Sequence, residues 1–326
     1  MSGAATASRP RPAALPLGDL SPPGPVAAAA TRASTLAPAR GTVRVLTGSP
    51  LDPTDDVGAG PALLRDAVAR GHGGWLRVYR PAPTVAFSRR DALHAGFARA
   101  VRASTEHGFT PVLRAPGGRA AAYHQGALCI ELVVADADAS TGSTRRFEEL
   151  ADVLLEVLRS FGVDAQVGAV PDEYCPGRHS VNGAGRVKLA GTAQRVVRGG
   201  WFLGGVLLVD GAGPVRDVIA PVYDALGLRC DVATIGSVSE LCSGVEIDDV
   251  TSVLLAALAR RLPLEAAHHP FDLLGRARAA ALEHPALERP ALEHPALEHP
   301  ALELPALAGR AKAAPAPTPQ PARGEA

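Results

Sequence analysis

Proline limits which parts of this chain of 326 residues can form regular structure. Residues 284–303 are a tandem repeat of HPALE with one RPALE variant, and a proline at every fifth position prevents a continuous helix. Residues 1–40 are Pro, Ala, Ser and Thr with scattered Arg, and they bury too little apolar surface to offset their ordering entropy. We therefore expect a disordered arm over 1–40, a folded domain over 41–265, and a disordered linker and repeat tail over 266–326.

The repeat also spaces three histidines regularly, at His284, His294 and His299. A metal site needs ligands that are held in a fixed geometry. Nothing in a segment interrupted by proline brings the three rings together, so we interpret their spacing as the result of repeat expansion. The sequence predicts no metal site.

Composition excludes several classes of protein. The 33 basic and 33 acidic residues give a net charge of +0, which provides no electrostatic basis for binding nucleic acid or an anionic membrane. No apolar run approaches the roughly 18 residues of a membrane helix, and proline interrupts every candidate signal peptide. The four cysteines contain no CxxC pair and are too sparse for a disulfide scaffold. We expect a globular protein of the cytoplasm.

The central part alternates strand and helix patterns. Several strand patterns follow one another directly and others are separated by amphipathic helices, which favours an α+β fold with a mixed or antiparallel sheet flanked by helices. The predicted strands are 75–80, 84–89, 109–115 and 127–136, with further strands across 180–210. The predicted helices are 94–108, 144–162, 215–227 and 246–262.

A glycine-rich loop follows the strand at 109–115 and contains the first candidate binding residues. Gly117 and Gly118 allow a ligand to approach the backbone closely, and Arg114 and Arg119 could bind a carboxylate or phosphate. The alternative is a tight connection with exposed arginines. The loop matches neither the phosphate-binding P-loop nor the dinucleotide-binding pattern.

Lysine usage indicates a second candidate. Only Lys188 and Lys312 are lysines among the 33 basic residues, so Lys188 is the one lysine of the predicted domain. Cys175 precedes Lys188 by 13 residues on a predicted loop, and a nearby ammonium would favour its thiolate. The alternatives are an inert loop cysteine and a lysine retained by chance. Cys129 fits a core position, and Cys230 and Cys242 lack a basic context.

Three segments together resemble the lipoate–protein ligase and octanoyltransferase family. They are GGRAAAYH at 117–124, GRVKLAGTAQR at 185–195 and GGVLLV at 204–209. The resemblance covers about 60–245 and implies the fold shared with biotin ligases. It also implies attachment of octanoate or lipoate to a lysine of lipoyl-carrier domains. The GGRA loop, as opposed to GGGA, is most similar to the cysteine-dependent octanoyltransferases.

The resemblance assigns roles to individual residues. Lys188 would touch the acyl carbonyl or acyl-adenylate, and Cys175 would be the nucleophile. Gly117, Gly118 and His124 match the family's acyl-binding loop. Gly191 and Gln194 match the family's motif around Lys188. Leu113 and Gln125 stand where the family usually has Arg and Asp, and these departures favour acyl transfer over ATP-dependent ligation.

The resulting hypothesis is a protein acyltransferase that needs no cofactor. Cys175 would take an acyl group from acyl carrier protein, and the lysine of a lipoyl domain of a 2-oxoacid dehydrogenase or of a glycine cleavage H-type protein would receive it. Leu128, Ile130 and Leu132 would line a tunnel for the chain, whose burial contributes about 0.8 kcal/mol per CH₂. The alternatives are a lipoate ligase that uses ATP and Mg²⁺, and a non-catalytic acyl- or carrier-binding protein of the same fold.

Overall fold

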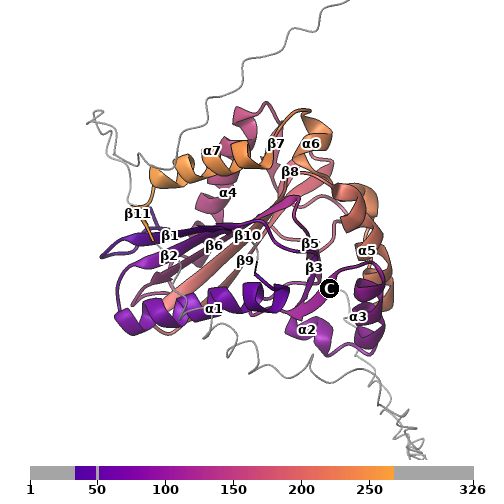
Figure 1. Ribbon diagram of the computed structural model, residues 1–326, viewed down its shortest axis with the longest axis horizontal. Coiled ribbons are helices and arrows are strands. Elements are labelled where there is room, and N and C mark those ends of the chain that lie inside the picture. The colour runs from indigo at the N-terminus through magenta and orange to yellow at the C-terminus, as the bar shows by residue number, and fades with distance from the viewer. Residues whose placement is uncertain (1–33, 49–50, 268–326) are drawn as a thin grey trace, which may run out of the picture. The chain divides into compact units, whose positions relative to one another are not determined.

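The computed structural model describes residues 34–48 and 51–267 (Figure 1). An eight-stranded sheet and a three-stranded sheet form its framework. In spatial order the large sheet contains β11 (Leu264–Ala266), β1 (Val43–Gly48), β2 (Gly74–Tyr79), β6 (Ala127–Ala135), β10 (Gly200–Leu208), β9 (Val187–Val197), β8 (Val181–Gly183) and β7 (Ala165–Val167). The small sheet contains β4 (Thr110–Leu113), β3 (Thr84–Phe87) and β5 (Ala121–Tyr123). β1 pairs in parallel with β2 and β11, whereas the other pairs of the large sheet are antiparallel.

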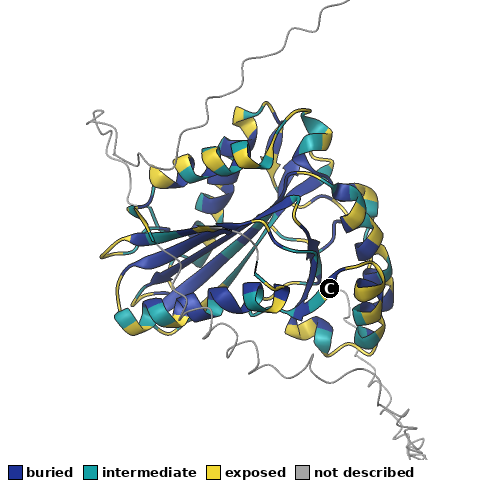
Figure 2. Ribbon diagram, in the orientation of Figure 1, coloured by how far each residue is buried: buried dark blue, intermediate teal, exposed yellow. Residues whose placement is uncertain are grey.

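Helices cover both faces of the large sheet (Figure 1). α1 (Pro53–Arg70) packs on one face over β6 and β10, and α4 (Ser143–Ser160) and α7 (Ile247–Ala259) pack on the other. Every residue of β6 is buried, as expected for a central strand between two layers (Figure 2). The fold class predicted from the sequence, a mixed sheet flanked by helices, is confirmed.

The three-stranded sheet forms a second packing unit at one side of the large sheet. α3 (Phe97–Glu106) and α5 (Ala212–Ala225) pack against each other and against strands of this small sheet. Short helical turns complete the described chain: α2 (Arg89–Ala92), the 3₁₀ turn η1 (Val232–Thr234) and α6 (Val238–Leu241). The predicted strands 75–80 and 84–89 correspond to β2 and β3, and the chain crosses between them from the large sheet to the small one.

α1 was not predicted, although it has 18 residues. Gly58, Gly60 and Pro61 lie within it, and such residues are poor helix formers. The packing explains one of them, because a Cβ at Gly60 would lie 2.4 Å from a ring carbon of Phe202 on β10. The helix therefore lies close to the sheet at Gly60, and a larger residue there would have to displace the Phe202 ring.

The packed part of the chain begins before residue 41. Leu36 is fully buried in the main core, and the Ser34 hydroxyl donates a hydrogen bond of 2.7 Å to Glu149 on α4. Residues 34–40 therefore belong with the domain, although their composition matches that of the predicted arm. Residues 1–33 and the repeat tail lie outside the described residues, so the expectations for them stay predictions. No helix in the described part is long and apolar enough to cross a membrane.

Candidate active site

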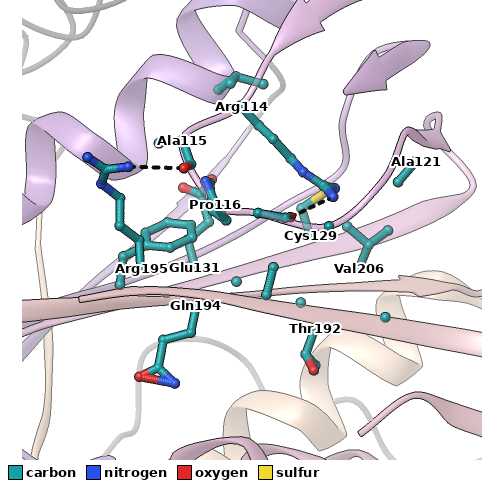
Figure 3. A pocket seen from close by; sticks show the side chains of 18 of the residues that line it. Arg114, Ala115, Pro116, Ala121, Cys129, Glu131, Thr192, Gln194, Arg195 and Val206 are labelled. Carbon is teal, nitrogen blue, oxygen red and sulfur yellow. Dashed lines mark hydrogen bonds between the residues drawn. The ribbon is translucent and has the colours of Figure 1, made fainter. Parts of the chain in front are cut away.

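A cavity of about 1160 Å³ brings together the two motifs singled out in the sequence. It lies between α1, one face of the large sheet and two loops, the glycine-rich loop and the loop before β8. Cys175, Lys188, Gly117, Gly118 and Gly191 all line it. Figure 3 shows the glycine-rich loop with Arg114 above the strands of the sheet. Residues from distant parts of the sequence thus form one site.

Cys175 is held by the glycine-rich loop. The backbone amide of Arg119 donates to its Sγ at 3.3 Å, and Nη2 of Arg114 lies 3.7 Å from the same sulfur. The Cys175 amide donates a hydrogen bond of 2.6 Å to the hydroxyl of Tyr223, and this hydroxyl donates to the carbonyl of Ala120. Cys175 has a φ of +41°, which a residue with a side chain rarely adopts. These contacts hold Cys175 in an unusual backbone conformation and fix the position of its thiol.

The surroundings favour the thiolate of Cys175. Burial alone would raise the pKa of this thiol, but the charges of Arg114 and Lys188 and the Arg119 amide outweigh burial and lower the pKa. Two other thiols behave differently: burial raises the pKa of Cys230 to about 11 and that of Cys129 far above its usual range. Cys175 is therefore the cysteine best suited to act as a nucleophile.

Lys188 is buried, with 3% of its surface exposed, and all three of its N–H donors are used. Nζ donates to Oε1 of Glu173 at 3.0 Å, to the carbonyl of Tyr174 at 3.0 Å and to the carbonyl of Cys175 at 2.7 Å. In this state Lys188 shapes the cysteine loop and places its charge near the thiol. To touch an acyl carbonyl, as the family resemblance implies, it must exchange one of these partners.

Gly118 is required by the closeness of the two loops. A Cβ at this position would lie 2.7 Å from Nη2 of Arg114 and 3.0 Å from Sγ of Cys175, and φ is +105°. By contrast, a Cβ at Gly117 would meet no atom within 4 Å. A Cβ at Gly191 would lie 3.2 Å from Cε of Lys188, so this glycine leaves room for the lysine side chain.

The two predicted arginines differ in where their side chains lie. The Arg114 guanidinium donates to the carbonyls of Gly117 and Arg119, so it folds over the glycine-rich loop beside Cys175. The Arg119 guanidinium instead pairs with the buried Asp91 at 3.3 Å. Arg119 therefore contacts the thiol through its backbone amide only.

Two further predicted residues make contacts away from Cys175. The side chain of Gln194 points to the other side of its strand (Figure 3), where it accepts from Arg146 at 2.8 Å and donates to the carbonyl of Ser143. His124 joins two turns, because Nδ1 accepts from the amide of Gly126 and Nε2 donates to the carbonyl of Gly211. Neither side chain contacts the thiol in the structure.

The sheet wall of the cavity differs from the sequence expectation. Of the three residues predicted to line a tunnel, Leu128 and Leu132 pack in the core on the opposite face of β6, whereas Ile130 packs in this core and also lines the cavity. The intervening residues Cys129 and Glu131 face the cavity instead (Figure 3). Alternation along the strand decides which set faces the ligand, and a charged residue inside an apolar strand was the available signal. Tyr223 and Glu173 were also missed, since neither lies in a recognisable motif.

Comparison with known proteins places the chain in a family. Residues 59–259, more than half of the chain, match the Lipoyl protein ligase A/B catalytic domain. The chain is 28% identical over 195 residues to an Octanoyl-[GcvH]:protein N-octanoyltransferase of Bacillus velezensis. This match covers 56% of the chain and 63% of the relative, so the chain spans less than two thirds of that protein's length.

Solved structures show the same fold. A bipartite lipoate protein ligase of Thermoplasma acidophilum superposes with a TM-score of 0.56 at 18% identity, over 74% of this chain and 92% of that one. A lipoate-protein ligase A bound with ATP superposes with a TM-score of 0.55 at 20% identity, over 74% and 93% of the respective chains. The sequence motifs, the fold and the match over residues 59–259 agree, and the chain belongs to the lipoyl protein ligase A/B catalytic domain family.

Proposed function

We propose that this protein is an acyltransferase that carries an octanoyl or lipoyl group on Cys175 and passes it to a lysine of a lipoyl-carrier domain. The observation that carries the proposal is the environment of the Cys175 thiol. It lines the cavity, accepts a hydrogen bond from the Arg119 amide at 3.3 Å, and has a lowered pKa. An enzyme that only activates a free acid with ATP has no need for such a thiolate.

The reaction has two balanced steps. The thiolate of Cys175 attacks the acyl carbonyl of the donor, a thioester forms, and the donor leaves as an amine or thiol after taking up a proton. The neutral amine of the acceptor lysine then attacks this thioester, the C–S bond breaks, an amide forms, the nitrogen releases one proton to solvent, and Cys175 leaves as the thiolate. The positive charges of Arg114 and Lys188 would stabilise the anionic oxygen that develops in both steps.

The donor and acceptor are proposed from the relatives and the family. The Bacillus relative is named for an octanoyl group on GcvH, which supports an octanoylated glycine cleavage H-type protein as the donor here. The sequence-based expectation of acyl carrier protein as the donor stays a prediction. The Thermoplasma structure of the same fold is described together with its E2 lipoyl domain, which is consistent with our proposal that lipoyl domains of 2-oxoacid dehydrogenases are acceptors.

The decisive experiment traps the intermediate. The protein is incubated separately with octanoylated H-type protein and with octanoyl acyl carrier protein, and the peptide containing Cys175 is analysed by mass spectrometry. We expect one octanoyl group, removable by neutral hydroxylamine, and transfer to a purified lipoyl domain. Cys175→Ala should lose both signals, while Cys129→Ala, a thiol in the same cavity, should retain them.

The ligase alternative has its own outcome in the same assay. The lipoyl domain is also offered with ATP, Mg²⁺ and free lipoate. Full ATP-dependent lipoylation by Cys175→Ala, without any trapped thioester, would replace the transferase with the ligase. No modification of the lipoyl domain under any condition would favour the non-catalytic binding protein.

A further inference from the structure

β9 is longer than the strand that covers one of its sides. It runs from Val187 to Val197, but β8 pairs with it only as far as Ala190. On the other side, β10 pairs with β9 continuously from Ala190 to Val197. Residues 191–197, about 20 Å of extended chain, therefore form an open edge of the large sheet where β8 ends.

The register with β10 shows which backbone groups the open edge presents. A two-residue turn joins β9 to β10, so Val197 and Gly200, which flank the turn, bond to each other, and every second residue of β9 bonds to β10 in the same way. The backbone groups of Thr192, Gln194 and Val196 therefore point away from β10. These outward groups, three amides and three carbonyls, have no hydrogen bond within the described part of the chain. Such an edge is a template for pairing with another extended chain.

The open edge begins beside the candidate nucleophile. A Cβ at Gly191, its first residue, would lie 3.2 Å from Cε of Lys188, whose Nζ donates to the Cys175 carbonyl at 2.7 Å. The loop that contains Cys175 leads into β8, on the same side of β9 as the outward groups. Six of the seven residues of the open edge line the cavity that Cys175 also lines. A segment paired with this edge would therefore have one end near the thiol.

The charge available beside the open edge is positive. Arg195 on β9 and Arg178 on the loop that contains Cys175 are exposed and line the cavity, and neither forms an ion pair among the described residues. Arg195 lies on the same side of β9 as the glycine-rich loop (Figure 3). Of the described residues that line the cavity, Glu131 is the one acidic residue, and it is buried against Arg77, which also pairs with Asp56. The exposed arginines thus remain available to an acidic partner.

We propose that the open edge of β9 binds an extended, acidic segment of the acyl-accepting protein, which adds to the sheet as a further strand. Backbone pairing would hold this segment in one register, and its carboxylates would contact Arg178 and Arg195. The inference rests on the proposed acyl transfer and names the surface that receives its protein substrate. A second copy of this chain, paired through the same edge, is the competing occupant.

Amide hydrogen exchange tests the pairing directly. Exchange of the intact protein is followed by NMR with and without an acidic, unmodified lipoyl domain. In the free protein, the amides of Ala193, Arg195 and Val197 should exchange slowly because they bond to β10, and the three outward amides should exchange quickly. The lipoyl domain should slow the outward amides by at least about tenfold. Unchanged exchange there would overturn the inference, and so would protection that depends only on the concentration of this protein, because it would assign the edge to a second copy.

A proline variant tests the same pairing in the reaction. Val196→Pro removes one outward amide and no bond to β10, a place where edge strands tolerate proline. Val196→Thr loses the same apolar side chain but keeps the amide, so it is the matched control. We expect Val196→Pro to raise KM for the lipoyl domain at least about fivefold, while acylation of Cys175 by the octanoyl thioester of N-acetylcysteamine stays unchanged. Equal KM values for the two variants would overturn this inference alone, whereas no acylation of Cys175 in wild type would overturn the proposed function.

A charge variant tests the acidic character of the segment. The double variant Arg178→Gln with Arg195→Gln should raise KM for the lipoyl domain at low salt, and its difference from wild type should shrink at about 0.5 M NaCl because salt screens exposed charges. Arg102→Gln, which changes an exposed arginine of α3 outside the cavity lining, should leave KM unchanged. An unchanged KM in the double variant would overturn the acidic class of partner.

Discussion

The two walls of the cavity bury ionisable groups with opposite results. The loop wall consists of the glycine-rich loop and the loop before β8, and the sheet wall consists of the strands opposite them. On the loop wall, Cys175 lies near the cations Arg114 and Lys188 and accepts a hydrogen bond from the Arg119 amide, and its pKa is lowered. On the sheet wall, Cys129 lies near Glu131 and Asp56, and burial raises its pKa far above the usual range. Both thiols line one cavity. Fixed cations and a directed amide, and not position in a cavity, distinguish a reactive cysteine from a core cysteine.

Removing the Lys188 ammonium from the loop wall should have the largest effect on activity. Lys188→Ala is expected to lower acyl transfer by about 10³-fold, because the thiolate and the developing oxyanion lose their nearest ammonium. It also leaves Glu173 buried without its cation, so the free energy of unfolding should fall by about 3–5 kcal/mol. Acylation kinetics and chemical denaturation measure the two losses.

The matched variants separate activity from stability. The double variant Lys188→Met with Glu173→Gln should recover much of the stability and none of the activity. Lys188→Arg should also be inactive, because a planar fork cannot replace a compact ammonium whose three acceptors lie within 3.0 Å. Lys312→Ala, which changes the other lysine of the chain, serves as the control. Near-normal turnover by Lys188→Arg would refute the role of Lys188.

On the sheet wall, the corresponding substitution should affect mainly stability. Arg77→Leu leaves Asp56 and Glu131 buried without a cation, and we expect a loss of about 3–5 kcal/mol in the free energy of unfolding. The triple variant Arg77→Leu, Asp56→Leu and Glu131→Leu removes all three charges and should be much closer to wild type. A triple variant as unstable as the single one would show that lost packing, and not unpaired charge, causes the effect.

The sheet wall should also give stability a pH dependence. Burial raises the pKa of Asp56 from 3.8 to about 6, so the folded protein binds this proton more tightly than the unfolded chain. Protonated Asp56 therefore contributes about 3 kcal/mol to the free energy of unfolding. This contribution is fully present below about pH 4 and is lost as the pH rises to about 6. The difference in unfolding free energy between wild type and Asp56→Asn, measured from pH 4 to 7, should show this decline. A constant difference would contradict it.

The sequence predicted the loop wall far better than the sheet wall. Lys188, Gly118 and Cys175, which line the cavity, could be named from the sequence because they lie in short motifs or stand out by residue type. Glu131 and Arg77 are 54 positions apart and meet only through the register of β2 with β6. Tyr223 comes from α5 and bonds to two different loops. Such contacts depend on tertiary packing, which local periodicity does not specify.

The same reason explains which elements of the fold the sequence predicted correctly and which it missed. The amphipathic helix α4 was predicted from its apolar spacing, with boundaries that differ by one or two residues. α1 was missed because Gly58, Gly60 and Pro61 weaken the local helix pattern, and only the packed structure shows that Gly60 lies against Phe202 on the sheet. Leu36 was assigned to a disordered arm because its neighbours are typical of one, although its side chain is fully buried. Local composition cannot show such long-range packing.

Loss of the Tyr223 hydroxyl should have the smallest effect on activity, because Tyr223 is a positioning residue that touches no substrate. Its hydroxyl accepts from the Cys175 amide at 2.6 Å and donates to the Ala120 carbonyl at 3.0 Å, so it joins the two loops that hold the thiol. Tyr223→Phe keeps the buried ring and removes both bonds. We expect about a tenfold fall in kcat with little change in KM, consistent with a loss of about 1–2 kcal/mol in positioning.

The pH dependence of cysteine alkylation shows whether this loss acts through Cys175. Iodoacetamide labelling, followed by mass spectrometry, should titrate Cys175 below the usual thiol range in wild type, and Tyr223→Phe should move that midpoint upward as the sulfur leaves the Arg119 amide. Cys230, with a pKa raised to about 11, provides an internal reference in the same sample. A structural role alone would lower the melting temperature without moving the Cys175 midpoint. That result would remove Tyr223 from the site and leave the electrostatic difference between the two walls to Arg114 and Lys188.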